Sequence, residues 1–299
     1  DGTVESPLGA ALELLDHPRF GYVTRMGIDR EGAGGTARTD LHFEFPARKG
    51  LDFSDVDLSA EATISDASLR RVALGQPLVD GQIGLELDKL GFDLAGSGSF
   101  GGVPREFTWI ERFEETPLER RIEATGWATT DQIAAIIYDI EPHVEGPLGI
   151  GLTFLDFDDG TSRLSANVDL TRATAGIAMP EYRKPEGQAA SASFTIDMAD
   201  NEVRLIRDIR IDSADLALTG RAEFESGSNS PSYTELDRIA LQGSDLSNVI
   251  VAFAGQRTDI VLGGGILDVS SMFEEEETGA DDTGTAGVPP DEGTADAGT

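Results

Sequence analysis

The chain has 299 residues, enough to bury a sizeable core as one elongated domain or two compact ones. Its 55 acidic and 23 basic residues give a net charge of −32, and it shows no Lys/Arg patch of the kind that nucleic acids and anionic lipid surfaces require. It has no cysteine, which excludes disulfides, zinc–thiolate sites, iron–sulfur clusters and cysteine nucleophiles.

The chain begins at Asp1 rather than at a methionine and shows no secretory signal peptide. No run of about 18 apolar residues is present, so we expect no segment of this sequence to span a bilayer. We therefore expect the sequence to be cut from a longer protein, with any membrane anchor outside it.

Helical spacing of apolar residues predicts a short helix over 5–15, and strand patterns dominate from about Tyr22 to Val269. Successive strand side chains point to opposite faces, so a period of two predicts one apolar and one wet face. The clearest runs pair apolar with polar positions in Leu41–Phe45, Ile83–Asp88, Leu164–Leu170 and Phe194–Met198.

Clusters of Gly, Asp, Asn and Pro separate the strands and predict turns, for example at Gly32–Gly35 and Gly101–Pro104. One internal helix is predicted at about Thr130–Ile140, capped by Thr129 or Thr130 and ended by Pro142. We expect its apolar positions to pack on the sheet.

Residues 274–299 are a low-complexity stretch of Gly, Thr, Asp, Glu, Ala and Pro with nine acidic and no basic residues. Such a composition cannot bury enough apolar surface to offset the entropy of ordering. We expect two parts: a β-domain over 1–273 and an acidic disordered linker or tail over 274–299.

Two sequence motifs resemble ligand-binding loops. The glycines of Gly96–Gly101 match G-x-G-x-x-G, but a strand pattern follows where a dinucleotide site needs a helix, so they are interpreted as a turn or strand irregularity. Asp156–Gly160 lacks the EF-hand spacing and predicts a hairpin turn, which leaves incidental surface calcium open.

The three histidines, His17, His42 and His143, have no metal-ligand spacing, and no G-x-S-x-G motif is present. We predict no cofactor, no metal site, no catalytic residue and no enzyme. Trp109 and Trp127 flank a segment with three arginines; they are interpreted as packing residues rather than as a carbohydrate or headgroup contact.

Several segments, taken in their order along the chain over roughly 15–270, resemble the domain shared by YhdP-type, AsmA-like (TamB-related) envelope proteins of Gram-negative bacteria. The similarity lies in Pro18–Gly21, Gly27–Asp29, Gly35, Leu41–Pro46, Gly91–Gly96, Gly102–Pro104, Phe107–Trp109, Glu145–Leu148, Val168–Thr171, Tyr182–Gly187 and Leu218–Phe224.

The resemblance implies a mainly β fold: a long, curved antiparallel sheet folded lengthwise into an open apolar groove, with one or two short helices. It further implies a periplasmic segment tethered to the inner membrane by an anchor outside this chain. Such a segment would shield phospholipid acyl chains, transfer them between the inner and outer membranes and support outer-membrane integrity, and it would bind no nucleic acid.

We expect such a groove to bind lipid diffusely, without cationic anchors on its apolar wall, because each acyl CH₂ moved from water gains about 0.8 kcal/mol. The expected lining residues are Phe43, Phe45, Phe53, Leu58, Ile83, Leu85, Leu87, Phe92, Leu94, Leu164, Val168, Leu170, Phe194, Ile196, Leu216 and Leu218.

Three other interpretations stay open. The same residues would form an ordinary core if two sheets closed on one another, as in a β-sandwich. A secreted adhesive or carbohydrate-binding β-sandwich domain is the second functional hypothesis, and surface aromatics gathered on one patch would favour it. An acidic hydrolase would need a cleft with perturbed carboxylates, which the sequence neither shows nor excludes.

Overall fold

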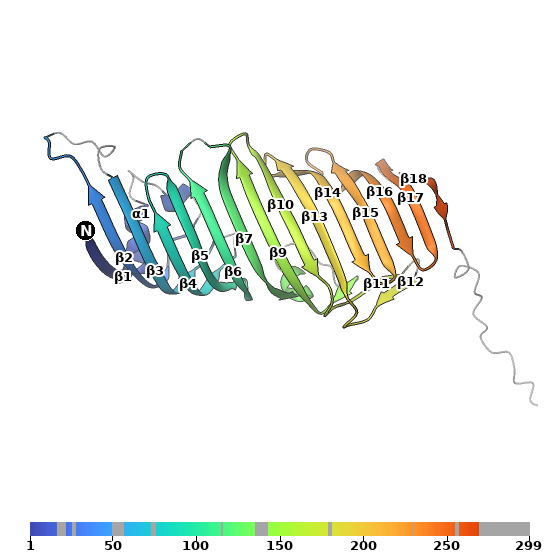
Figure 1. Ribbon diagram of the computed structural model, residues 1–299, viewed down its shortest axis with the longest axis horizontal. Coiled ribbons are helices and arrows are strands. Elements are labelled where there is room, and N and C mark those ends of the chain that lie inside the picture. The colour runs from blue at the N-terminus through green and yellow to red at the C-terminus, as the bar shows by residue number, and fades with distance from the viewer. Residues whose placement is uncertain are drawn as a thin grey trace, which may run out of the picture. The chain divides into compact units, whose positions relative to one another are not determined.

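The computed structural model describes residues 1–16, 22–25, 28–49, 57–72, 76–114, 116–134, 143–178, 181–228, 230–254 and 257–268. The described residues form a mainly β structure built on one 15-stranded antiparallel sheet that does not close into a barrel (Figure 1). The prediction of a mainly β fold built on a long antiparallel sheet with short helices is therefore confirmed, and the open apolar groove stays a prediction. The described residues contain no second large sheet of the kind that a sandwich requires.

The strands of the main sheet follow the chain order, so most of them pair with their neighbours in sequence; the exceptions are β7 with β9 and β10 with β13, where the intervening strands belong to a small second sheet. The main sheet consists, in order, of β1 (Gly2–Pro7), β2 (Gly34–Glu44), β3 (Asp57–Leu69), β4 (Leu78–Leu87), β5 (Gly91–Phe100), β6 (Val103–Arg112), β7 (Leu118–Thr129), β9 (Pro147–Phe157), β10 (Thr161–Asp169), β13 (Ala190–Ala199), β14 (Glu202–Ser213), β15 (Leu216–Phe224), β16 (Pro231–Leu241), β17 (Ser244–Ala254) and β18 (Arg257–Ile266).

A small three-stranded sheet has the order β12-β11-β8, and three short helices complete the described structure. Their bounds are β8 (Val144–Glu145), β11 (Thr174–Ala178), β12 (Glu181–Lys184), α1 (Leu8–Leu15), α2 (Tyr22–Arg25) and α3 (Thr130–Ala134).

The predicted first helix is confirmed in part. It begins at Leu8, because the preceding residues form β1 and pair with β2, Glu5 lying opposite Arg38. Tyr22–Arg25 is a helix rather than the start of the strand region. Leu8 and Leu12 of α1 are buried against Ala37 of β2 and its neighbours on β3 and β4, so α1 covers part of one face of the sheet.

The predicted internal helix begins at Thr130, and its capping by Thr129 is confirmed. The Gln132 amide N–H donates to Thr129 Oγ1 at 3.4 Å, and the Thr129 N–H donates to Gln132 Oε1 at 2.9 Å, which is a capping box. The predicted continuation over 135–140 lies outside the described residues, as does the tail over 274–299.

Inside three strands the two-residue alternation slips by one position, and an aspartate occupies each slip. Asp66, Asp80 and Asp208 have φ of 55°, 55° and 54° and sit at register shifts of β3, β4 and β14. Aspartate tolerates this left-handed conformation better than most residues, and one extra residue restores the following apolar side chains to the same face. Ile206, Ile209 and Ile211 of β14 thus stay on one side.

A buried lysine ties the small sheet to the end of β10. Lys184 is 1% exposed, and its Nζ donates to the carbonyl oxygens of Ala173 at 2.7 Å, Pro185 at 3.0 Å and Thr171 at 3.4 Å. Burial lowers the pKa of Lys184. The ammonium satisfies three carbonyl groups that would otherwise lose a partner.

We predict that Lys184→Met destabilises the protein by roughly 1–3 kcal/mol, because it removes three hydrogen bonds and takes from the Ala173 carbonyl its Lys184 donor. The Thr171 and Pro185 carbonyls still accept from the backbone N–H groups of Gly187 and Gln188. Chemical denaturation of the full chain measures this loss. Lys89→Met is the matched control, since Lys89 is 64% exposed and meets only the partly exposed Asp57, and it should change stability little. Equal effects of the two substitutions would contradict the role of Lys184.

Candidate functional site

The strand register sorts the sheet's side chains onto two faces, because directly opposed residues of an antiparallel pair share a face. One row of opposed residues crosses ten consecutive strands, from β3 to β15, and every member is apolar. We call the side that carries it the apolar face. The row consists of Ala62, Leu85, Leu94, Trp109, Ile122, Phe154, Leu164, Ile196, Ile206 and Ala222.

The register places thirteen of the sixteen expected lining residues on this face. They are Phe43, Leu58, Ile83, Leu85, Leu87, Phe92, Leu94, Leu164, Val168, Phe194, Ile196, Leu216 and Leu218. Phe45 and Leu170 lie just beyond the ends of β2 and β10, and Phe53 lies outside the described residues. The alternation thus brings together residues from distant parts of the sequence, which is the arrangement that a shared apolar surface needs.

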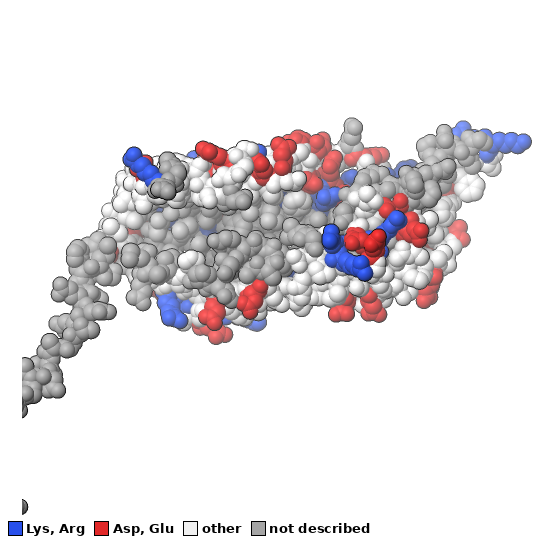
Figure 2. All heavy atoms as spheres, turned by 180° about the vertical axis from the view of Figure 1, so that it is seen from behind, with Lys and Arg blue, Asp and Glu red and all other residues white. Residues whose placement is uncertain are grey.

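The extent to which other elements pack on the apolar face differs along the sheet. Near β2–β4 it packs against α1, and near β14–β16 it packs against the small sheet, where Tyr182 is buried with Leu216 and Leu241. Between these regions Phe154, Leu164 and Ile196 are only partly buried. Figure 2 shows the side of the molecule opposite to that of Figure 1; acidic side chains gather mainly along its margins, and much of the described surface between them is uncharged.

Contrary to the expectation of no cation on this wall, Arg120 lies on the apolar face, paired across the strands with Glu111 and Asp156. Its Nε and Nη2 donate to the Glu111 carboxylate at 2.7 and 3.0 Å, and its Nη1 donates to Asp156 at 3.5 Å. The hydrogen bond to Glu111 raises the pKa of Arg120. The Trp109 indole N–H donates to the same carboxylate at 2.8 Å, so the charge is held in a paired, partly buried network.

Arg105 is a second cation on this face, opposite Gly126 of β7. Its Nη1 is buried and has no hydrogen-bond partner among the residues that the structure describes, and burial lowers the pKa of its guanidinium. Alternation within each strand is the signal that could have found them, since Arg105 is in phase with Phe107 in β6 and Arg120 is in phase with Ile122 in β7.

The two tryptophans do not form one patch. Trp109 belongs to the apolar face and is 8% exposed, in tilted contact with Phe92 at 5.7 Å between ring centroids. Trp127 belongs to the opposite face and is 41% exposed, with the Arg172 guanidinium 4.3 Å from its ring centroid. The interpretation of Trp109 as a packing residue is confirmed.

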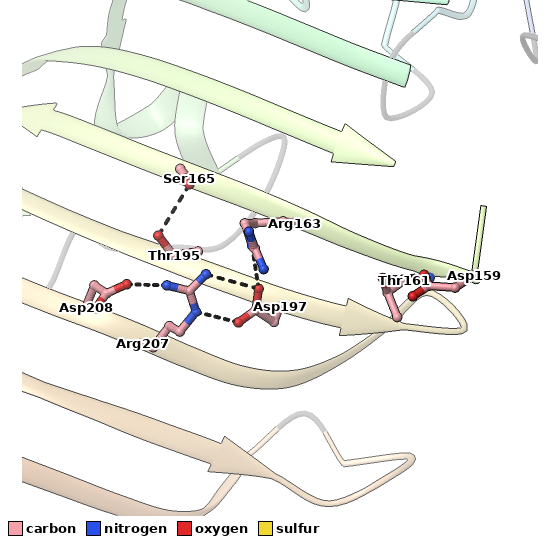
Figure 3. Close-up of polar contacts among 8 residues, drawn as sticks. All are labelled: Asp159, Thr161, Arg163, Ser165, Thr195, Asp197, Arg207 and Asp208. Atoms are coloured by element: carbon pink, nitrogen blue, oxygen red, sulfur yellow. Dashed lines mark hydrogen bonds and ion pairs between the residues drawn. The ribbon is translucent and has the colours of Figure 1, made fainter. Parts of the chain in front are cut away.

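The opposite, polar face carries hydrogen-bonded charges that bridge neighbouring strands (Figure 3). Asp197 of β13 accepts hydrogen bonds from Arg163 of β10 at 2.8 Å and from Arg207 of β14 at 2.6 Å. Burial by itself would raise the pKa of Asp197, but these two hydrogen bonds outweigh it and lower the pKa. Asp197 therefore stays ionised to a lower pH than a free aspartate.

A hollow of about 540 Å³ lies on the polar face over β2–β6, lined in part by Asp40, Glu61, Glu86 and Asp93. These four carboxylates oppose one another in a single row across four strands. Small residues such as Gly84 and Ala95 make room for the hollow. Like charges directly opposite one another destabilise a sheet, so this row costs stability.

The structure shows where the glycine motif and the aspartate-rich turn lie. Gly96 and Gly98 lie within β5 as regular strand residues, and a Cβ on Gly96 would come 2.3 Å from the Gln82 carbonyl oxygen; they therefore permit close strand packing, and the turn falls at Gly101–Gly102. The predicted turn over Asp158–Gly160 joins β9 to β10 and is confirmed. Among the described residues no group of acidic or histidine side chains could hold a metal ion.

Comparisons with family models, with curated proteins and with solved structures found no match for this chain. Within the described part of the chain, no helix is long and apolar enough to cross a membrane.

The network on the apolar face yields a stability prediction. Glu111→Gln removes the charge that compensates Arg120, so we expect the free energy of unfolding to fall by roughly 1–3 kcal/mol. The double variant Glu111→Leu/Arg120→Met removes both charges and should recover much of that loss. Denaturant titration of the three proteins measures both effects, and a double variant no more stable than Glu111→Gln would argue against charge compensation.

The acidic row yields a prediction of opposite sign. Glu86→Gln places a neutral side chain between the carboxylates of Glu61 and Asp93 and so removes two repulsive contacts. We expect the free energy of unfolding to rise by about 0.5 kcal/mol in low salt, with a smaller gain in high salt. Glu106→Gln is the matched control, because Glu106 lies opposite Ser97 and Thr125. Thermal melts at two ionic strengths provide the test, and a salt-independent gain would exclude the electrostatic cause.

Proposed function

We propose that this chain is a non-enzymatic segment of a bridge across the periplasm that shields acyl chains and transfers phospholipid between the inner and outer membranes. In this proposal the sheet curves lengthwise so that its apolar face lines a groove, and an anchor outside this chain tethers it to the inner membrane.

The observation that carries the proposal is the apolar row that crosses ten strands without a polar member. At about 4.8 Å between strands, nine spacings extend over about 43 Å. That exceeds the roughly 30 Å hydrocarbon core of a bilayer, which two opposed acyl layers fill. A surface of this length supports an acyl chain at many equivalent positions.

Energetics favour movement along such a surface rather than capture at one point. Each CH₂ gains about 0.8 kcal/mol wherever it contacts an apolar wall, so neighbouring positions have similar free energies. The carboxylates of the polar face and the margins add a repulsion that keeps anionic headgroups off the walls.

The adhesive hypothesis stays a prediction, but the geometry favours it less. It called for surface aromatics on one patch, whereas Trp109 and Trp127 lie on opposite faces of the sheet. It also assumed a sandwich, and the described residues form one large sheet.

Site-specific photocrosslinking tests the proposal. The photoreactive residue p-benzoylphenylalanine replaces Phe154 on the apolar face or, as the matched control, its neighbour Thr153 on the polar face. We expect irradiation with phospholipid vesicles to attach lipid at position 154 and not at 153, with mass spectrometry as the readout. The bulky aromatic analogue preserves packing at 154, and circular dichroism verifies that both variants are folded.

Two outcomes would contradict the proposal. Lipid attached equally at both positions would indicate nonspecific adsorption. Absence of lipid at 154 in a folded protein, together with purified wild-type chain free of phospholipid, would favour a dry packing role for the apolar face.

A further inference from the structure

The two edges of the 15-stranded sheet differ in how readily a further strand can pair with them. At one edge, β1 is only six residues long and ends in Pro7, which has no backbone N–H. At the other edge, β18 has ten residues, pairs with β17 on one side and is exposed along its whole length (Figure 1). An edge strand of this kind presents unpaired backbone groups to solvent.

The side chains of β18 lack the features that normally block such pairing. Ile260, Val261, Leu262 and Ile266 are 63%, 56%, 51% and 69% exposed, and no charge or proline lies between Ile260 and Ile266. The charges of the strand, Arg257 and Asp259, pair with each other at 2.7 Å. The edge is therefore locally neutral and apolar although the chain as a whole carries −32.

The number of strands restricts which partner continues the sheet. All neighbouring strands are antiparallel, and fifteen is odd, so β1 and β18 run in the same direction. A second copy that docked β1 on β18 would form a parallel pair or would turn its apolar face to the other side. A two-fold axis normal to the sheet, with β18 meeting β18, gives an antiparallel pair and keeps both apolar faces on one side.

We propose that the chain forms a two-fold symmetric dimer in which β18 of each copy adds as an antiparallel strand to the other. The pairing satisfies the open backbone groups of β18 and covers its exposed apolar side chains. It also adds apolar side chains in phase with the apolar row beyond its interruption at Thr234 of β16, because Thr234 opposes Val251 and Val251 opposes Ile260. The proposal concerns assembly, and it holds or fails independently of lipid transfer.

Sedimentation velocity of the full chain over a range of concentrations tests the dimer. We expect twice the chain mass of 31.8 kDa, and we expect Ile260→Lys/Leu262→Lys to return the protein to the monomer mass. Val4→Lys on the β1 edge is the matched control, since Val4 is 47% exposed, and it should leave the dimer intact. Circular dichroism of each variant establishes that it is folded.

Spin labels locate the interface while the apolar side chains of β18 stay unchanged. The chain has no cysteine, so Thr258→Cys in β18 or Val4→Cys in β1 carries a single label. Two labels on paired β18 strands lie within about 35 Å of each other, because a ten-residue strand is about 33 Å long. We expect this short distance for Thr258→Cys and its absence for Val4→Cys.

A monomer at every concentration would overturn the proposal, as would an assembly that grows beyond two copies. A short distance at Val4, or a dimer that survives in the folded lysine variant, would do the same.

Discussion

The whole structure depends on the register of its antiparallel hydrogen-bond ladder. Side chains alternate with period two, so a shift of one residue in any strand would move that strand's apolar side chains to the polar face. The aspartates at positions 66, 80 and 208 show how the chain keeps phase across irregular positions: each adds one residue in a left-handed conformation, and the next apolar residue returns to the same side. The apolar row exists because the strands keep this phase.

Among the described residues no second large sheet covers the apolar face, and smaller elements cover only parts of it. α1 covers part of it near β2–β4, and Tyr182 covers part of it near β14–β16. Arg120 is acceptable on this face because Glu111, Asp156 and the Trp109 ring surround its guanidinium. The polar face in contrast holds opposed carboxylates, which keep the molecule soluble at some cost in stability.

The proposed roles use this asymmetry in different ways. The proposed lipid transfer would use the middle of the apolar face, where Phe154 and Leu164 are partly exposed. Self-association uses the edge at β18, where open backbone groups and apolar side chains coincide. Lipid transfer requires weak, repeated contacts with a moving acyl chain, whereas self-association requires a fixed set of hydrogen bonds in one register.

The sequence alone determined the strand-rich class, the alternation of individual strands, the short N-terminal helix and the Asp158–Gly160 turn, and it restricted the cap of the internal helix to Thr129 or Thr130. These features are local, because propensity, periodicity and turn chemistry act within a few residues. Alternation also brought thirteen expected residues to one face, since the period is a property of each strand. It did not reveal β1, whose partners in β2 lie between Thr36 and Leu41 in the sequence, nor that Arg105 and Arg120 share the apolar face.

Only the tertiary structure decided that the strands form one unbroken sheet with two unlike edges rather than two sheets face to face. Both arrangements satisfy the same local patterns, and the choice rests on long-range hydrogen bonds between strands. The register likewise decided that Trp109 lies on the apolar face and Trp127 on the polar face. The two residues belong to different strands, β6 and β7, and the turn between these strands sets which positions share a face, so counting residues from one tryptophan to the other does not give the answer. Such pairing between strands is a collective property that no single segment encodes.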